Sequence, residues 1–155
     1  MTGENDLFTV LDGETSPHAR SLSKVVGATF EKMGFMQSFV CQKRDEDINM
    51  LCATLVVEEP VTAKIYFSCP RTLSWSIAEN LYGLEELSNE VVADMMTELL
   101  NTIAGSWLSH IMPNQTFTLS IPSCCEDTFH IDEDMHEYHF KIANAGVISI
   151  GLKKL

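Results

Sequence analysis

Basic residues are scarce in this chain. It has 10 lysines and arginines against 22 aspartates and glutamates, which gives a formal net charge of −12. The basic residues are scattered along the sequence, whereas binding to nucleic acid or to an anionic membrane requires a basic patch. We therefore expect no nucleic acid and no membrane surface as partner. A protein surface that carries lysine or arginine fits this composition better.

Long apolar runs and a recognisable disulfide pattern are also missing. No run approaches the roughly 20 residues of a transmembrane helix, and the opening MTGENDLFTV is polar and acidic, unlike a signal peptide. The cysteines lack C-x-x-C spacing; Cys41, Cys52 and Cys69 lie in strand-like runs, where a thiol usually acts as a small buried hydrophobe. No neighbouring cation lowers the pKa of Cys124 or Cys125, which favours a structural role. We expect a cytoplasmic protein.

The common enzyme motifs are absent as well: a phosphate-binding glycine loop, G-x-S-x-G and H-E-x-x-H. His130, His136 and His139 lie among acidic residues, a composition that could bind a metal ion. If residues 136–143 form a strand, however, His136 and His139 point to opposite faces and cannot share an ion. Surface histidines are therefore favoured, and metal binding by residues 126–139 is kept as an alternative.

The most informative stretch that is present is a long amphipathic helix, predicted over residues 88–112 with Ser88 as its N-cap. Its apolar residues recur at the three-and-four spacing of a buried face: Val92, Met95, Met96, Leu99, Ile103 and Trp107. Four residues of different character fall within about 60° of one another on the opposite side: Asp94, Glu98, Asn101 and Gly105. The helix therefore combines a buried face with a narrow polar stripe.

Other elements follow from similar patterns. A helix is predicted over residues 17–33, with Ser16 as cap and Pro17 at its first position, and a shorter helix over 72–82 that ends at Gly83. Strand-like runs occupy residues 36–43, 48–57, 61–69, 117–121, 136–143 and 146–154. Residues 122–134 are expected to be irregular, and Asn144-Ala145-Gly146 to form a hairpin turn.

The order of these elements suggests an internal duplication. Residues 23–30 align with residues 101–108, and each segment carries a glycine in mid-helix, Gly27 and Gly105. A mid-helix glycine costs about 1 kcal/mol relative to alanine, so two in matching places indicate that something approaches the helix backbone closely. The order helix–strand–strand–strand occurs twice, with the short helix between the copies.

We therefore predict an α+β fold, in which long helices cover one face of an antiparallel sheet of about six strands, arranged as two similar halves. Residues 1–15 are predicted to be an N-terminal segment with a possible short strand, and residues 16–155 a single domain. Only the second half carries the polar pair, because Arg20 and Ser23 occupy the corresponding places in the first helix. One candidate site is expected, not two.

Glu98 and Asn101 are the candidate working pair. Spaced i, i+3, they are neighbours on a helix surface. A carboxylate can pair with a cation, and an amide can orient a water molecule, which is a recognised task in phosphoryl transfer. A convex helix cannot enclose a small substrate, but it can insert these side chains into another protein's active site. The alternative is a solvated helix face, since exposed Glu and Asn are common.

The segment DMMTELLNTIAG, residues 94–105, resembles the signature of the CheC/CheX chemotaxis phosphatases: an acidic residue, then E-x-x-N, then a glycine. Residues 77–95 resemble the family's short helix and acidic linker, and LSIPS its strand that ends in proline. The resemblance spans residues 16–155. A single motif makes the chain more similar to CheX than to CheC, which typically carries the motif in both halves.

This resemblance implies a phosphatase that hydrolyses the aspartyl phosphate of a CheY-like response regulator. Asn101 would position the attacking water, Glu98 would bind the regulator's active-site lysine, and Asp94 and Gly105 would support them. The chain itself would bind no cofactor, because the required Mg²⁺ would sit in the regulator. A docking module without catalysis is the main alternative. The exposed edges of such a sheet, together with the family's habits, suggest a homodimer.

Overall fold

The computed structural model describes most of the chain. The described residues are 17–34, 38–41, 49–83, 85, 87–125, 135–142 and 146–155. The short strand considered within residues 1–15 lies outside them, and so do His130 and the residues Asn144 and Ala145 of the predicted hairpin turn. The boundary at residue 16 stays a prediction.

In this part the chain forms three α-helices and seven strands. The helices are α2 (Pro17–Gly34), α3 (Arg71–Tyr82) and α4 (Asn89–Ile111). The strands are β1 (Ser38–Cys41), β2 (Met50–Glu59), β3 (Ala63–Pro70), β4 (Thr118–Leu119), β5 (Ser123–Cys125), β6 (Met135–Ile142) and β7 (Gly146–Lys154). The predicted helices and long strands are confirmed within one or two residues at most ends.

The strands form one antiparallel sheet in the order β1-β6-β7-β3-β2-β4, and β5 also pairs with β2. This order confirms the predicted α+β fold with two similar halves. The last strands of the halves, β3 and β7, pair at the centre of the sheet. The first strand of each half pairs with the second strand of the other: β1 with β6, and β4 and β5 with β2. The halves are therefore interleaved and share one sheet.

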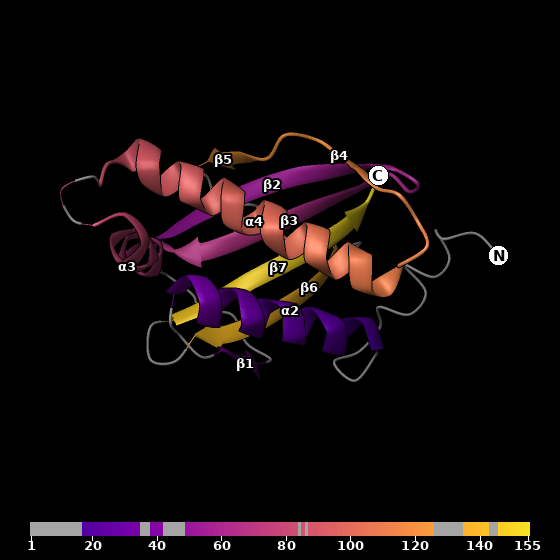
Figure 1. The fold of residues 1–155 in the computed structure, drawn as a ribbon, viewed down its shortest axis with the longest axis horizontal. Helices are drawn as coiled ribbons and strands as arrows, with labels where there is room; N and C mark the ends of the chain where they lie inside the picture. Colours follow the sequence, from indigo (N-terminus) through magenta and orange to yellow (C-terminus); the bar gives the residue numbers. More distant parts are fainter. Residues whose placement is uncertain are drawn as a thin grey trace.

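Helices α2 and α4 run side by side in opposite directions across one face of the sheet, and α3 packs near one end of both (Figure 1). Alternating strand residues point into the core beneath them, as a period of two requires. Trp107 of α4 is fully buried and meets Tyr138 of β6 edge-on, with ring centroids 6.4 Å apart. The core side of α4 comprises Val92, Met95, Met96, Leu99, Leu100, Ile103, Ala104, Trp107 and Leu108.

Local signals set the boundaries of α4. The Ser88 side chain accepts a hydrogen bond from the backbone N–H of Val91 at 3.2 Å, which caps the helix as predicted. The preceding helix α3 ends at Gly83, whose φ of 83° is a left-handed conformation that glycine adopts without steric cost. These two ends determine where α4 enters the helix layer.

The expectation for residues 117–134 was partly wrong. The predicted strand 117–121 is reduced to β4, and β5 begins within the segment expected to be irregular. Ser120 still bonds to β2, donating its backbone N–H to the Val56 carbonyl and accepting from the Val56 N–H on its Oγ, both at 2.8 Å. Pro122 has no N–H to donate. The chain therefore leaves the ladder briefly at Ile121, which is 92% exposed, and returns at β5.

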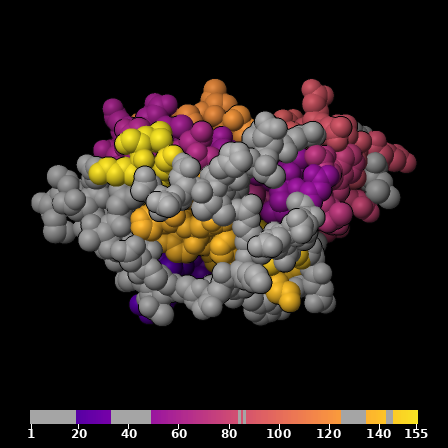
Figure 2. Space-filling view, turned by 180° about the vertical axis from the view of Figure 1, so that it is seen from behind, coloured from indigo at the N-terminus to yellow at the C-terminus, as the bar shows by residue number. Residues whose placement is uncertain are grey.

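The opposite face of the sheet is seen from behind in Figure 2, where the yellow C-terminal residues lie at the surface. Lys141 of β6 is exposed and alternates with the core residues Phe140 and Ile142, which places it on this rear face. None of the helices in the described ranges combines the length and apolar character needed to span a bilayer.

Candidate functional site

The predicted polar stripe of α4 faces solvent. Asp94, Glu98 and Asn101 are exposed, and Gly105, one turn further on, is half-buried. We call these four residues the α4 stripe. Because the opposite side of α4 supplies much of the core, the helix is held rigidly by its apolar face while the stripe projects from the molecule. The structure therefore places all four predicted site residues on one outward surface.

Glu98 has a neighbour that sequence reasoning missed. Tyr82, at the end of α3, donates its hydroxyl to Glu98 Oε2 at 3.5 Å, a long hydrogen bond. Partial burial raises the pKa of Tyr82, and the charge of Glu98, the hydrogen bond to it and the charge of Asp94 raise it further. No spacing rule links a residue of α3 to one on α4. Only the packing of the two helices brings them together.

Nearby hydroxyl groups do not occupy the stripe. Thr97 donates to the Asp94 carbonyl at 2.9 Å, and Thr102 donates to the Glu98 carbonyl at 2.9 Å. Both hydroxyls are therefore turned to the helix backbone. No hydrogen bond joins the Asn101 side chain to any residue in the described ranges. Its amide thus has a donor and an acceptor available to a water molecule or a partner.

Packing within the described part of the chain does not explain why position 105 is a glycine. A Cβ built at this position would meet no atom within 4 Å. The close approach expected from the mid-helix glycine is therefore not made by another described element of this chain. This leaves a partner molecule as the candidate for such an approach.

The first helix provides an internal comparison. Arg20 of α2 is exposed and Ser23 is half-buried, in the places that correspond to Glu98 and Asn101. The duplicated position thus carries the opposite charge and a hydroxyl instead of an amide. Of these two described helices, only α4 presents the carboxylate–amide pair.

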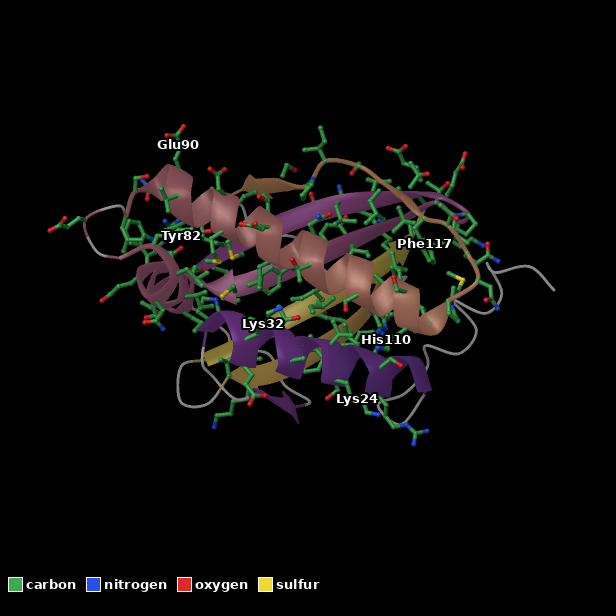
Figure 3. The ribbon with its side chains drawn as sticks, viewed as in Figure 1. Lys24, Lys32, Tyr82, Glu90, His110 and Phe117 are labelled. Atoms are coloured by element: carbon green, nitrogen blue, oxygen red, sulfur yellow. The ribbon has the colours of Figure 1, made fainter. Side chains whose placement is uncertain are left out.

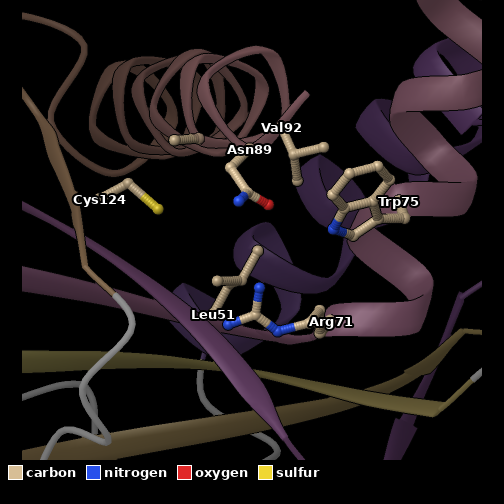
Figure 4. A pocket seen from close by; sticks show the side chains of 7 residues that line it. Leu51, Arg71, Trp75, Asn89, Val92 and Cys124 are labelled. Atoms are coloured by element: carbon tan, nitrogen blue, oxygen red, sulfur yellow. The ribbon is translucent and has the colours of Figure 1, made fainter. Parts of the chain in front are cut away.

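The cavity that the structure resolves near α4 is separate from this pair. It has a volume of about 70 Å³. Its lining, shown in Figure 4, consists of Leu51, Arg71, Trp75, Asn89, Val92, Ala93 and Cys124. This cavity lies at the start of α4 rather than at Glu98 and Asn101.

The residues considered for metal binding do not converge in the described part. His136 and His139 lie three positions apart on β6 and so point to opposite faces. His139 Nδ1 is 2.8 Å from Ser149 Oγ, and its Nε2 is 3.7 Å from Glu137 Oε1. No group of three or more potential ligands is present among the described residues. Residues 126–134 lie outside them, so this alternative stays a hypothesis.

Two buried cysteines have the structural character expected of them. Cys52 and Cys69 are buried in β2 and β3 as free thiols. Burial raises the pKa of Cys69 to about 12, which keeps its thiol protonated and unreactive. The side chains of Cys41 and Cys125 lie outside the described set.

Fold and site together define a class: an α+β domain with an interleaved duplication, whose candidate groups stand on a convex helix instead of in a pocket. A family model for the chemotaxis phosphatase CheX matches residues 51–143. The chain belongs to the CheX family. The comparison with curated proteins gives no match.

Solved structures agree in fold. The chain is similar to CheX from Desulfovibrio desulfuricans, with a TM-score of 0.71 at 15% identity over 89% of this chain and 99% of that one. It is similar to CheX from Vibrio vulnificus, with a TM-score of 0.71 at 15% identity over 89% and 96%. A third relative is in the CheX–CheY–BeF₃–Mg²⁺ complex from Borrelia burgdorferi, with a TM-score of 0.69 at 13% identity over 88% and 96%.

Proposed function

We propose that this protein hydrolyses the aspartyl phosphate of a CheY-like response regulator, and that α4 delivers Glu98 and Asn101 to the regulator's active site. The observation that carries the proposal is the exposure of this pair on a rigidly anchored helix in a chain of the CheX family. A convex surface suits a reaction whose substrate is itself a protein. The partner then supplies the enclosing half of the site.

In the proposed reaction Asn101 acts on water. Its amide oxygen accepts a hydrogen bond from the attacking water and its NH₂ group can donate to the phosphoryl oxygens. The water attacks phosphorus in line with the bond to the aspartate oxygen; that bond breaks, phosphate leaves and the aspartate carboxylate is restored. Glu98 pairs with the regulator's lysine and so sets the position of the helix. Asp94 and Gly105 support this contact from the turns on either side.

The metal ion of the reaction is assigned to the partner. The Borrelia structure contains CheX together with CheY, BeF₃ and Mg²⁺, and no candidate metal cluster is present in the described part of this chain. Mg²⁺ usually binds through one or two carboxylates together with phosphate oxygens. We therefore infer that the regulator holds the Mg²⁺ ion, where it neutralises charge at the phosphoaspartate.

A decay experiment tests the proposal. A phosphorylated regulator with Mg²⁺ should lose phosphate faster when this protein is added, and all regulators of the source organism should be compared. Asn101→Ala should lower kcat by about 10²-fold or more, because a poorly positioned nucleophile loses that much. Glu98→Ala should mainly raise KM, by about 30-fold if the lysine pair is desolvated and its loss costs about 2 kcal/mol.

Matched controls separate these effects from general damage. Asn114→Ala removes an exposed amide beyond the end of α4, and Glu58→Gln removes an exposed carboxylate at the end of β2. Both variants should keep wild-type rates. If Asn101→Ala is as active as wild type, the water-positioning mechanism is wrong. If the wild-type protein binds the regulator but does not accelerate phosphate loss, the protein is the docking module considered as the alternative.

Two further expectations belong to this proposal. With a phosphorylated response regulator as its partner, the protein is expected in the cytoplasm. The outer strands of the sheet, β1 on one side and β4 with β5 on the other, present edges that could pair with a second copy. Light scattering at the concentrations used for the decay experiment would establish whether a homodimer is present.

A further inference from the structure

The helix layer is divided by charge. On α4 the acidic residues Glu90, Asp94 and Glu98 are all exposed, and the helix contains neither lysine nor arginine. On α2 the exposed Arg20, Lys24 and Lys32 stand against a single acidic residue, Glu31. We call Arg20, Lys24 and Lys32 the α2 basic stripe. In a chain of net charge −12 with only 10 basic residues, this is a local concentration of positive charge.

The α2 basic stripe is available to a partner. Its three side chains form no ion pair with any residue in the described ranges, and Figure 3 shows Lys24 and Lys32 on α2 and Glu90 on α4. The two helices pack against each other, and packed helices lie about 8–10 Å apart, axis to axis. A receiver domain of about 100 residues has a radius of gyration of about 13 Å, so one that docks on the α4 stripe also extends over the neighbouring helix α2.

An acidic helix alone is a poor electrostatic match for a phosphoaspartate site. Such a site carries a phosphoryl group and the carboxylates that hold Mg²⁺, and only its lysine complements Glu98. The carboxylates of Asp94 and Glu90 approach the same acidic surroundings, and like charges across an interface oppose association. Positive charge beside α4 would offset this repulsion. The duplicated helix supplies it, with Arg20 in the place that corresponds to Glu98.

We propose that the α2 basic stripe is the second half of the docking surface and attracts the acidic rim of the phosphorylated regulator while α4 enters its active site. This inference rests on the proposed function, because it takes the regulator as the partner. The stripe acts on the rate of association and on orientation, not on the chemical step. The two halves of the duplication thus have different tasks: one helix carries the reacting pair and the other guides the partner.

The test compares two charge reversals with the same effect on net charge. Lys24→Glu reverses a charge in the stripe, and Lys141→Glu reverses an exposed lysine on the rear face of the sheet. The probe is a CheY-type receiver domain loaded with BeF₃⁻ and Mg²⁺, and its association rate is measured by stopped flow at several salt concentrations. We expect Lys24→Glu to slow association about threefold to tenfold at low salt. The loss should shrink as salt screens the charges.

The control and the reaction kinetics complete the test. Lys141→Glu should change the association rate by less than about twofold, because its charge is far from the docked partner. Lys24→Glu should leave kcat at the wild-type value and raise KM, whereas Asn101→Ala should lower kcat with association unchanged. Circular dichroism melts of both charge variants verify that they fold.

Each result decides the proposal. Equal association rates for Lys24→Glu and Lys141→Glu would overturn it. A changed oligomeric state of Lys24→Glu with unchanged association would assign the stripe to a second copy of this chain, and would also overturn it. A wild type that binds the probe without accelerating phosphate loss would contradict catalysis, while the comparison of association rates would still test the stripe. A wild type that does not bind any receiver domain would overturn both proposals.

Discussion

Replacing Gly105 with alanine distinguishes a role in docking from a role within the chain. Alanine is about 0.8–1.0 kcal/mol more favourable than glycine inside a helix. The added methyl group would meet no atom within 4 Å, so no steric cost reduces this gain within the described structure. A change of about 1 kcal/mol raises the Tm of a domain of this size by about 2–4 °C. We therefore expect Gly105→Ala to be more stable than wild type.

The same substitution should impair the proposed reaction. If the regulator packs against the helix backbone at Gly105, a methyl group there overpacks the interface at a cost of about 1–3 kcal/mol. This corresponds to about 5-fold to 150-fold in kcat/KM for the phosphorylated regulator. Gly105→Gln should lose more activity than Gly105→Ala, because the inserted side chain is larger.

Thermal melts and phosphate-release kinetics on the same samples provide the measurement. Ser106→Ala is the control, because it also favours the helix and leaves the α4 stripe unchanged. It should gain stability and keep full activity. A Gly105→Ala variant that is both more stable and fully active would show that no partner approaches the backbone there, and the reasoning from this glycine would fail.

Two other predictions concern the surroundings of α4. The pKa of Tyr82 should lie above its ordinary value of 10.0, and the difference between absorbance titrations with Tyr82 present and with Tyr82→Phe isolates it. In a Glu98→Gln background this pKa should fall, because a neighbouring negative charge has been removed. An unchanged pKa would contradict the contact between Tyr82 and Glu98. Because this pKa is raised in the folded state, the stability that Tyr82 contributes is present below pH 10 and is lost as the pH rises through the raised pKa. Ser88→Ala removes the acceptor of the Val91 N–H and should cost about 1 kcal/mol, seen as a Tm lower by about 2–4 °C with kcat unchanged. An unaltered melting temperature would show that this cap contributes nothing.

Much of the local structure was predictable because its signals are local. Pro17 begins α2 and Ser88 caps α4 where their chemistry indicated. The local nature of these signals also explains the main error, which is the predicted strand over residues 117–121. The run 117–121 has a uniform strand-like pattern, but Pro122 cannot donate to β2, and the ladder resumes only at β5. A pairing partner decides where such a strand is interrupted.

The sequence by itself determined which side of α4 is buried and which side carries Glu98 and Asn101, since the 3.6-residue period of a helix is written into the spacing of its side chains. Only the tertiary structure decided what lies around that pair. It interleaved the strands of the two halves, brought Tyr82 to Glu98, and packed α2 against α4. These contacts join residues that are distant in sequence. They depend on how the apolar faces of whole elements pack together, which no local pattern specifies.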